Sequence, residues 1–151
     1  MPEPADAQAA TLDRFISAWR ACSPGGLSSV MGADFTMQTL PFSLKEPLHS
    51  QAEMAGFLSV LRGIMSTFEL TVHNVVHDAA NGKAAIYAIT KADSPSGPYQ
   101  NEHAVFLWFD ESGEKVTRME EMVDSAFLKD YMPKLQAFLA QQAAKSSAAA
   151  E

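Results

Sequence analysis

Apolar residues recur at helical spacing in three parts of the chain. Leu12 and Phe15 share one helical face behind a possible cap at Asp6, and Ser50 opens a capping box ahead of the next apolar series. The third series contains Pro133, which is expected to kink or restart its helix. The pattern therefore predicts a helix that ends near residue 22, a short piece at 27–31, a helix over 51–65 and a last helix from 125 to about 139.

Between the helices the period changes to the alternation that is typical of β-strands. Turn residues separate the strands, among them Asn81-Gly82 and Ser112-Gly113. Connectors this short favour an antiparallel meander, because parallel neighbours need a crossover of about a dozen residues or more. The predicted strands are 34–40, 68–77, 83–92, 99–109 and 115–123. Together these elements indicate an α+β fold with helices packed on one face of a curved sheet.

The length and composition fit one folded domain. The chain has 151 residues, of which 47% are hydrophobic and 19% are charged, a balance that suits a single globular core. We expect the domain to span residues 11–140, with flexible tails at 1–10 and 141–151, where the periodic pattern is lost.

The charge and the cysteine content exclude several kinds of partner. Eighteen acidic against eleven basic residues give a net charge of −7, which repels phosphate backbones and anionic lipids. We therefore expect no nucleic acid and no membrane as partners. Cys22 is the only cysteine, so no internal disulfide forms and a reducing compartment is favoured. Because the first ten residues also lack the apolar block of a signal peptide, we expect a cytoplasmic protein.

The sequence carries no signature of a metal or cofactor site. It has no glycine-rich phosphate loop, no nucleophile elbow and no His-Glu-x-x-His. His73 and His77 are four residues apart, which in a strand is roughly 13 Å and too far for two ligands of one ion. We predict a protein that needs neither a metal nor an organic cofactor.

Acidic residues in the last two strands are the strongest candidates for chemistry. If Ser112-Gly113 is a two-residue turn, Ala104 pairs with Glu121 and Glu102 pairs with Val123. Glu121 then shares a face with Met119, Phe106 and Trp108, and Glu120 shares the other face with Arg118 and Met122.

A carboxyl group among such apolar side chains is suited to proton transfer, which makes Glu121 the first candidate for an acid or base. The alternative is that both glutamates are solvated or paired with Arg118.

Other candidates also have a purely structural explanation. Glu53 fits the capping box, and Asp124 fits the cap of the helix that follows it. Tyr87 and Trp108 belong to residue types that are more often core residues than ligand contacts. His103 fits either a proton shuttle or a buried histidine with a satisfied ring nitrogen.

Three local strings point to a known family. They are Leu-Pro-Phe-Ser-Leu at 40–44, Ala-Asp-Ser-Pro-Ser-Gly-Pro-Tyr-Gln-Asn-Glu-His at 92–103 and Glu-Glu-Met-Val-Asp-Ser-Ala-Phe at 120–127. The chain resembles the SnoaL-like family of the nuclear transport factor two-like superfamily over roughly residues 12–139, and is most similar in pattern to fungal meroterpenoid isomerases and cyclases. The resemblance implies a cone-shaped, curved antiparallel sheet with helices packed on its concave face, and homodimers with an acid-containing pocket in each cone.

The same resemblance extends to individual positions. It places Glu121 where SnoaL-like cyclases commonly keep a catalytic acid, and Gln38 where the meroterpenoid isomerases tend to have a basic residue. His103 replaces their usual tyrosine. The resulting catalytic candidates are Glu121, Asp124, His103 and Glu102, and the substrate-binding candidates are Tyr87, Asn101, Phe106, Trp108, Met119, Gln38 and Glu53.

The resemblance and the acidic strand residues favour a cofactor-independent isomerase or cyclase. Its substrate would be an apolar, polyketide- or terpenoid-derived intermediate, and Glu121 would move the proton. Dehydration is a further alternative, and a non-catalytic module that only binds a small molecule or dimerises is another. We also expect a homodimer, because Val105, Leu107 and Phe109 would form an apolar stripe facing away from the pocket.

Overall fold

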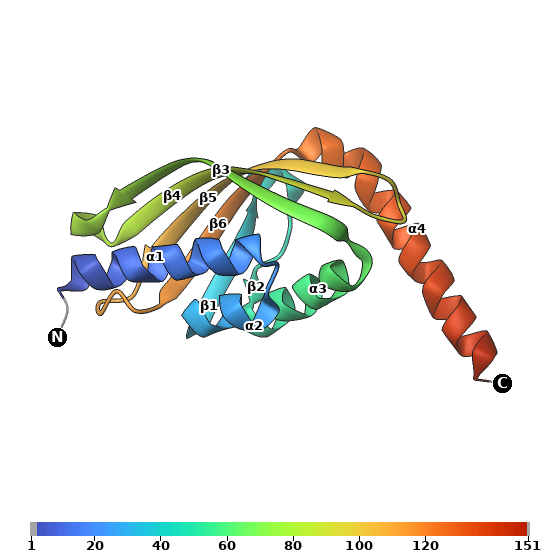
Figure 1. Ribbon diagram of the computed structural model, residues 1–151, viewed down its shortest axis with the longest axis horizontal. Helices are drawn as coiled ribbons and strands as arrows, with labels where there is room; N and C mark the ends of the chain where they lie inside the picture. Colours follow the sequence, from blue (N-terminus) through green and yellow to red (C-terminus); the bar gives the residue numbers. More distant parts are fainter. Residues whose placement is uncertain (1–2, 151) are drawn as a thin grey trace.

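Six strands form one curved sheet that arches over the first three helices (Figure 1). The computed structural model describes residues 3–150, and its mixed α and β architecture is the fold class that the sequence predicts. The strand order is β2-β1-β6-β5-β4-β3. The elements are α1 (Pro4–Arg20), α2 (Pro24–Val30), β1 (Met31–Leu40), η1 (Phe42–Leu44), β2 (His49–Ser50), α3 (Gln51–Ile64), β3 (Ser66–Asp78), η2 (Ala79–Asn81), β4 (Lys83–Asp93), β5 (Tyr99–Phe109), β6 (Val116–Val123) and α4 (Ser125–Ala149).

The concave face of the sheet holds the core. Along β4 and β5 buried and less buried residues alternate, so every second side chain points toward α1. Phe15 of α1 is 1% exposed and belongs to one cluster with Ile86, Val105 and Leu107 of the sheet. Burying a side chain such as Phe15 stabilises the fold by roughly 1.5–3 kcal/mol. This packing fixes which face of each strand carries the site.

Helix α1 begins at Pro4, inside the segment 1–10 for which the sequence predicts a flexible tail. Ala7 and Gln8 are 8% and 5% exposed, and the Thr11 hydroxyl donates to the Gly113 carbonyl at 2.8 Å. The first turns of α1 therefore pack against the loop between β5 and β6. The sequence pattern did not reveal this contact because alanine and glutamine give no apolar period. Residues 1 and 2 lie outside the described residues.

The sheet is mixed, although an antiparallel sheet is predicted. β1 runs parallel to β6, with Met37 opposite Met119 and Thr39 opposite Glu121. A parallel pair needs a long connection, which α3 and strands β3 to β5 supply. The other neighbours are antiparallel, as predicted for the meander.

The register between β5 and β6 differs from the predicted one by one residue. Phe109 pairs with Val116, as the predicted turn requires, but a bulge at Thr117 then brings Trp108 opposite Arg118. Glu121 consequently pairs with Val105, whereas the sequence predicts Ala104. The bulge also changes which β5 residues share a face with Glu121.

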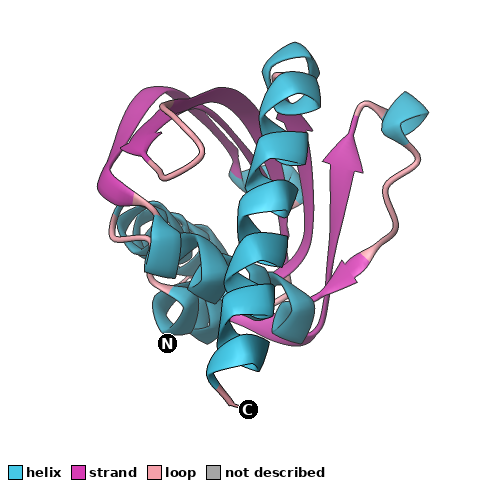
Figure 2. Ribbon diagram, turned by 90° about the vertical axis from the view of Figure 1, so that its right-hand side faces the viewer, coloured by secondary structure: helices cyan, strands magenta, loops and turns pink. Residues whose placement is uncertain are grey.

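Helix α4 runs across the open end of the cone and then away from the body (Figures 1 and 2). It continues through Pro133, where a kink or restart is predicted. Residues 141–149 are helical and exposed, and their flexibility stays a prediction. Within residues 3–150, none of the helices combines the length and the apolar character that crossing a bilayer requires.

Candidate active site

The concave face carries two polar side chains next to each other within its apolar rows. His103 belongs to the inner row of β5, and Glu121 belongs to the inner row of β6. His103 Nδ1 lies 2.5 Å from Glu121 Oε1, and their side chains are 8% and 15% exposed. Because an ionised carboxylate only accepts hydrogen bonds, this short contact requires a proton between the two atoms. The structure therefore pairs two of the predicted catalytic residues directly.

The two oxygens of the Glu121 carboxyl group have different surroundings. Oε1 faces His103, whereas Oε2 makes no hydrogen bond among residues 3–150. Within the same range no fully buried side-chain nitrogen or oxygen lacks a partner, so Oε2 is at least partly exposed to solvent. Oε2 is therefore the Glu121 oxygen that the described residues leave without a hydrogen bond.

Apolar and aromatic side chains surround the pair. The Trp19 ring meets the His103 ring edge-on, with 5.4 Å between the ring centroids. Burial raises the pKa of the Tyr99 hydroxyl, and the nearby charge of Glu121 raises it further. A hydrogen bond with the Thr90 side chain has a smaller, opposite effect. Further partly buried apolar residues packed against the core are Ile16, Met37, Met54, Leu58, Phe68 and Val72. The His103–Glu121 pair therefore borders the apolar core.

Asn101 and Asp124 join β5 to the start of α4. The Asn101 side chain accepts the Asp124 N–H at 3.0 Å and donates to the Asp124 carbonyl at 3.4 Å, and it is 1% exposed. The Asp124 carboxylate caps α4 by accepting the Phe127 N–H at 3.2 Å. Their contacts are structural, as the capping explanation of Asp124 predicts.

Glu102 and Tyr87 lie on the convex face, away from the His103–Glu121 pair. The Tyr87 hydroxyl donates to the Glu102 carboxylate, and this hydrogen bond raises the pKa of Tyr87. The His73 ring stands edge-on to Tyr87 at 5.7 Å. Because successive strand residues alternate between faces, Glu102 cannot join its neighbour His103 inside the cone.

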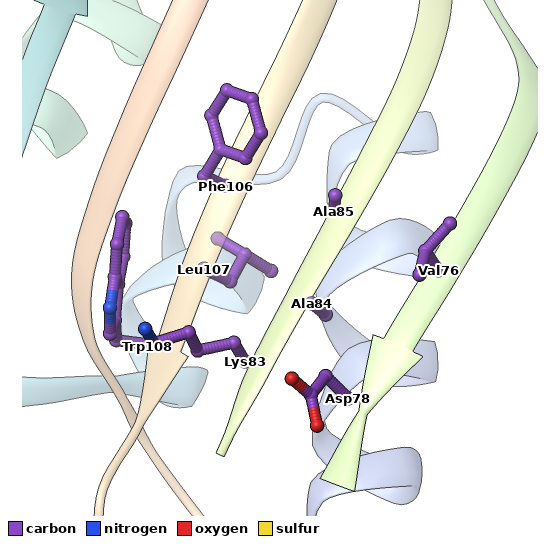
Figure 3. Close-up of a pocket in the computed structure, with 8 residues that line it drawn as sticks. All are labelled: Val76, Asp78, Lys83, Ala84, Ala85, Phe106, Leu107 and Trp108. Atoms are coloured by element: carbon purple, nitrogen blue, oxygen red, sulfur yellow. The ribbon is translucent and has the colours of Figure 1, made fainter. Parts of the chain in front are cut away.

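Phe106 and Trp108 also lie on the convex face, where they line a shallow hollow of about 140 Å³ with Lys83 and Asp78 (Figure 3). The Arg118 guanidinium stacks over Trp108 at 4.7 Å and pairs with Glu120. The predicted grouping of Glu121 with Phe106 and Trp108 is therefore wrong.

The inner positions of β5 belong instead to Val105, Leu107 and Phe109, which are 0%, 0% and 9% exposed. The prediction that these three residues form an outward stripe for dimerisation is also wrong, because they build the core against α1.

The remaining predicted ligand contacts have structural partners. Gln38 Nε2 donates to the Glu46 carbonyl at 2.9 Å and so fastens the loop after β1. Glu53 completes the capping box with Ser50 and is exposed at the start of α3. Met119 is 4% exposed in the core, two residues before Glu121 on the same face. None of these contacts places Gln38 or Glu53 beside the His103–Glu121 pair.

No three metal-ligating side chains come together among the residues that the structure describes. Independence from metals and cofactors stays a prediction. Cys22 is buried, and burial raises the pKa of its thiol despite the opposing charge of Arg62. A thiol in that state is a poor nucleophile.

Sequence reasoning missed Thr90, Tyr99 and Trp19. Thr90 Oγ1 lies 2.8 Å from His103 Nε2, on the side of the ring opposite Glu121. The alternation of β4 offered a signal for Thr90, because it puts a hydroxyl in step with buried alanine and isoleucine. Trp19 follows Phe15 by four residues and so lies on the same helical face, but no local pattern connects it to His103.

Comparison with solved structures places the fold in the SnoaL-like, nuclear transport factor two-like class. The BvnE pinacolase of Penicillium brevicompactum superposes with a TM-score of 0.81 at 20% identity, covering 91% of this chain and 96% of that chain. A SnoaL-like protein of Shewanella denitrificans gives a TM-score of 0.68 at 11% identity, covering 83% of this chain and 96% of that chain. At these identities the likeness shows the fold alone.

Comparison with curated proteins shows the family. Monooxygenase nsrQ of Aspergillus novofumigatus is 50% identical over 140 residues, 93% of each chain. Monooxygenase AacuP of Aspergillus aculeatus is 50% identical over 139 residues, 92% of this chain and 96% of that one. A Claviceps purpurea relative, named an ergochrome gene cluster protein, is 41% identical over 138 residues, 91% of this chain and 90% of that one. No family model matches the chain. The chain belongs to the family of fungal proteins that includes nsrQ and AacuP.

Proposed function

We propose that the chain is a cofactor-independent isomerase or cyclase that acts by proton transfer on an apolar polyketide- or terpenoid-derived intermediate. The observation that supports this most is the His103–Glu121 pair on an apolar concave face, where Glu121 Oε2 makes no hydrogen bond to the described residues. The name of the relative from an ergochrome gene cluster and the pinacolase of similar fold agree with natural-product chemistry.

The reaction begins with removal of a proton from a carbon next to a carbonyl group. Glu121 Oε2 takes the proton, and the electron pair of the C–H bond moves into an enolate. In an isomerisation the same proton returns at another position. In a cyclisation the enolate attacks the carbon of a second carbonyl group and closes a ring, and the new alkoxide takes the proton back from Glu121. Substrate and product then have the same atoms. Loss of a hydroxide from the enolate, with the proton from Glu121, gives the dehydration alternative.

A second candidate function follows from the names of the relatives, which include monooxygenases. The same proton removal at a CH₂ group produces a carbanion that dioxygen can oxidise to a hydroperoxide. Loss of water from the hydroperoxide leaves a ketone, so that the CH₂ compound and O₂ give the ketone and H₂O. The substrate supplies the electrons in this scheme, and the role of Glu121 is unchanged.

The two functions are distinguished with 2-tetralone, an apolar fused-ring ketone with acidic C–H bonds beside its carbonyl. In D₂O without oxygen, the isomerase or cyclase proposal predicts enzyme-catalysed exchange of these hydrogens, measured by NMR above the uncatalysed rate. With oxygen, isomerase chemistry consumes no O₂, whereas the second candidate incorporates ¹⁸O from ¹⁸O₂. Binding without exchange or O₂ uptake favours the non-catalytic alternative.

A homodimer is also proposed, through a different surface from the one that the sequence suggested. On the convex face Tyr87, Phe106 and Met122 are 37%, 40% and 40% exposed, beside the hollow that contains Trp108. Large apolar side chains gathered on one sheet face favour association between copies of a chain. The concave site would stay accessible in such a dimer, because it lies on the other side of the sheet.

A further inference from the structure

Thr90 is the one polar side chain in the inner row of β4. Thr90 is 2% exposed, and its strand lies between β5 and β3 in the sheet. A valine has nearly the same shape and would fit the apolar row, so the reason for a hydroxyl here is its hydrogen-bond partner. The other residues of the row are Ala84, Ile86, Ala88 and Ala92.

That partner is the catalytic-site histidine. Thr90 Oγ1 lies 2.8 Å from His103 Nε2, while Nδ1 of the same ring lies 2.5 Å from Glu121 Oε1. Both ring nitrogens of His103 are therefore occupied by the protein. The histidine has no free nitrogen with which to take a proton from a substrate.

The proton count of the ring decides what Thr90 does. An ionised Glu121 only accepts, so Nδ1 must carry the hydrogen between them. A neutral imidazole has one N–H, which leaves Nε2 with a lone pair that the Thr90 hydroxyl can meet as a donor.

We propose that Thr90 is a positioning residue that donates its hydroxyl proton to His103 Nε2 and thereby holds His103 as the neutral Nδ1–H tautomer, which donates to Glu121. In this arrangement His103 orients and stabilises the carboxylate, and Glu121 Oε2 is the atom that meets the substrate. This role in proton transfer rests on the proposed function, whereas the tautomer itself does not.

The tautomer is measured directly on the full chain labelled with ¹⁵N. Long-range ¹H–¹⁵N spectra distinguish a protonated, pyrrole-like nitrogen from an unprotonated, pyridine-like one, and a His103→Gln variant identifies the signals of His103. We expect a pyrrole-like Nδ1 and a pyridine-like Nε2 in the wild-type chain. Thr90→Val should shift both signals toward the other tautomer or an average, and Thr90→Ser should restore them.

Two results overturn the assignment. The first is a protonated Nε2 in the wild-type chain, as either the other tautomer or the imidazolium. The second is a folded Thr90→Val variant with the wild-type His103 signals. If Thr90→Val does not fold, the wild-type and Thr90→Ser spectra still decide, because a protonated Nε2 in either rejects the proposal.

Catalysed exchange of 2-tetralone adds a functional readout. Thr90→Val should lower the rate by about tenfold or more, because the wrong tautomer no longer donates to Glu121, and Thr90→Ser should recover most of it. Exchange that is unchanged in a folded Thr90→Val variant contradicts a positioning role in catalysis. The two proposals can also fail separately. If the wild-type chain shows no exchange activity but its Nδ1–H tautomer depends on Thr90, the proposed function is rejected and the Thr90 assignment stands.

Discussion

Gly113 tests whether the first turns of α1 are part of the packed domain. Its φ is +78°, and a Cβ at this position would lie 2.6 Å from the Pro4 carbonyl oxygen and 2.9 Å from Gln8. Gly82 is a matched control at the neighbouring β3–β4 connection, because its φ is +61° but its Cβ would meet Gln8 only at 3.8 Å. Both alanine variants carry the left-handed backbone penalty, and only Gly113→Ala adds a clash with α1.

The expected losses of unfolding free energy follow from the backbone penalty and the clash. Gly82→Ala should lower the free energy of unfolding by about 1 kcal/mol, the cost of a left-handed alanine. Gly113→Ala should cost about 2–4 kcal/mol, because overpacking against backbone adds about 1–3 kcal/mol. Urea unfolding at one protein concentration measures both. With an m-value of about 2 kcal/mol/M for a chain of this size, the midpoints should differ by about 0.5–1.5 M. Equal losses in the two variants would mean that residues 4–10 are a loose tail after all.

Two further predictions concern pH and assembly. Burial and the charge of Glu121 raise the pKa of Tyr99 in the folded chain above its ordinary value of about 10. The stability that neutral Tyr99 contributes is therefore complete below about pH 10, and it is lost as the pH rises toward the raised pKa. Above about pH 10, the unfolding free energy of the wild-type chain should therefore fall faster than that of Tyr99→Phe, by up to about 1.4 kcal/mol per pH unit. Urea titrations at several pH values measure this, and equal slopes for the two chains would refute it. For assembly, Phe106→Glu on the convex face should convert a dimer into a monomer in sedimentation at micromolar concentration, while Phe57→Glu, on the exposed side of α3, should leave the dimer intact. A wild-type monomer would contradict the proposed dimer.

The sequence predicted the elements well because their signals are local. Helical spacing, the capping box at Ser50 and the turn glycines depend on neighbouring residues. The structure has helices at the first two, and Gly82 and Gly113 adopt positive φ at the predicted turns. The parallel contact of β1 with β6 was missed, because a pairing between strands about 80 residues apart leaves no local pattern.

The sequence predicted the position of Glu121 correctly, but two errors in the reasoning cancelled. Glu121 lies on the concave face as predicted, but the bulge at Thr117 shifted the register, and the inward residues of β5 are Val105 and Leu107 instead of Phe106 and Trp108. The error in register and the error about the inward face of β5 offset each other at Glu121. Both faces of β5 are apolar, so its sequence could not show which one the helices cover.

The central claim is that Glu121, on the concave face, transfers the proton, while its neighbour Glu120 does not. The most direct test is the rate of catalysed hydrogen exchange of 2-tetralone in D₂O by the Glu121→Gln and Glu120→Gln variants, with folding confirmed by circular dichroism. Glu120 is paired with Arg118 on the convex face, so its variant should retain the wild-type rate. Glu121→Gln should lower the rate by about a hundredfold or more, the scale of losing a proton-transfer group. Equal rates in the two variants, or a large loss in Glu120→Gln alone, would contradict the account.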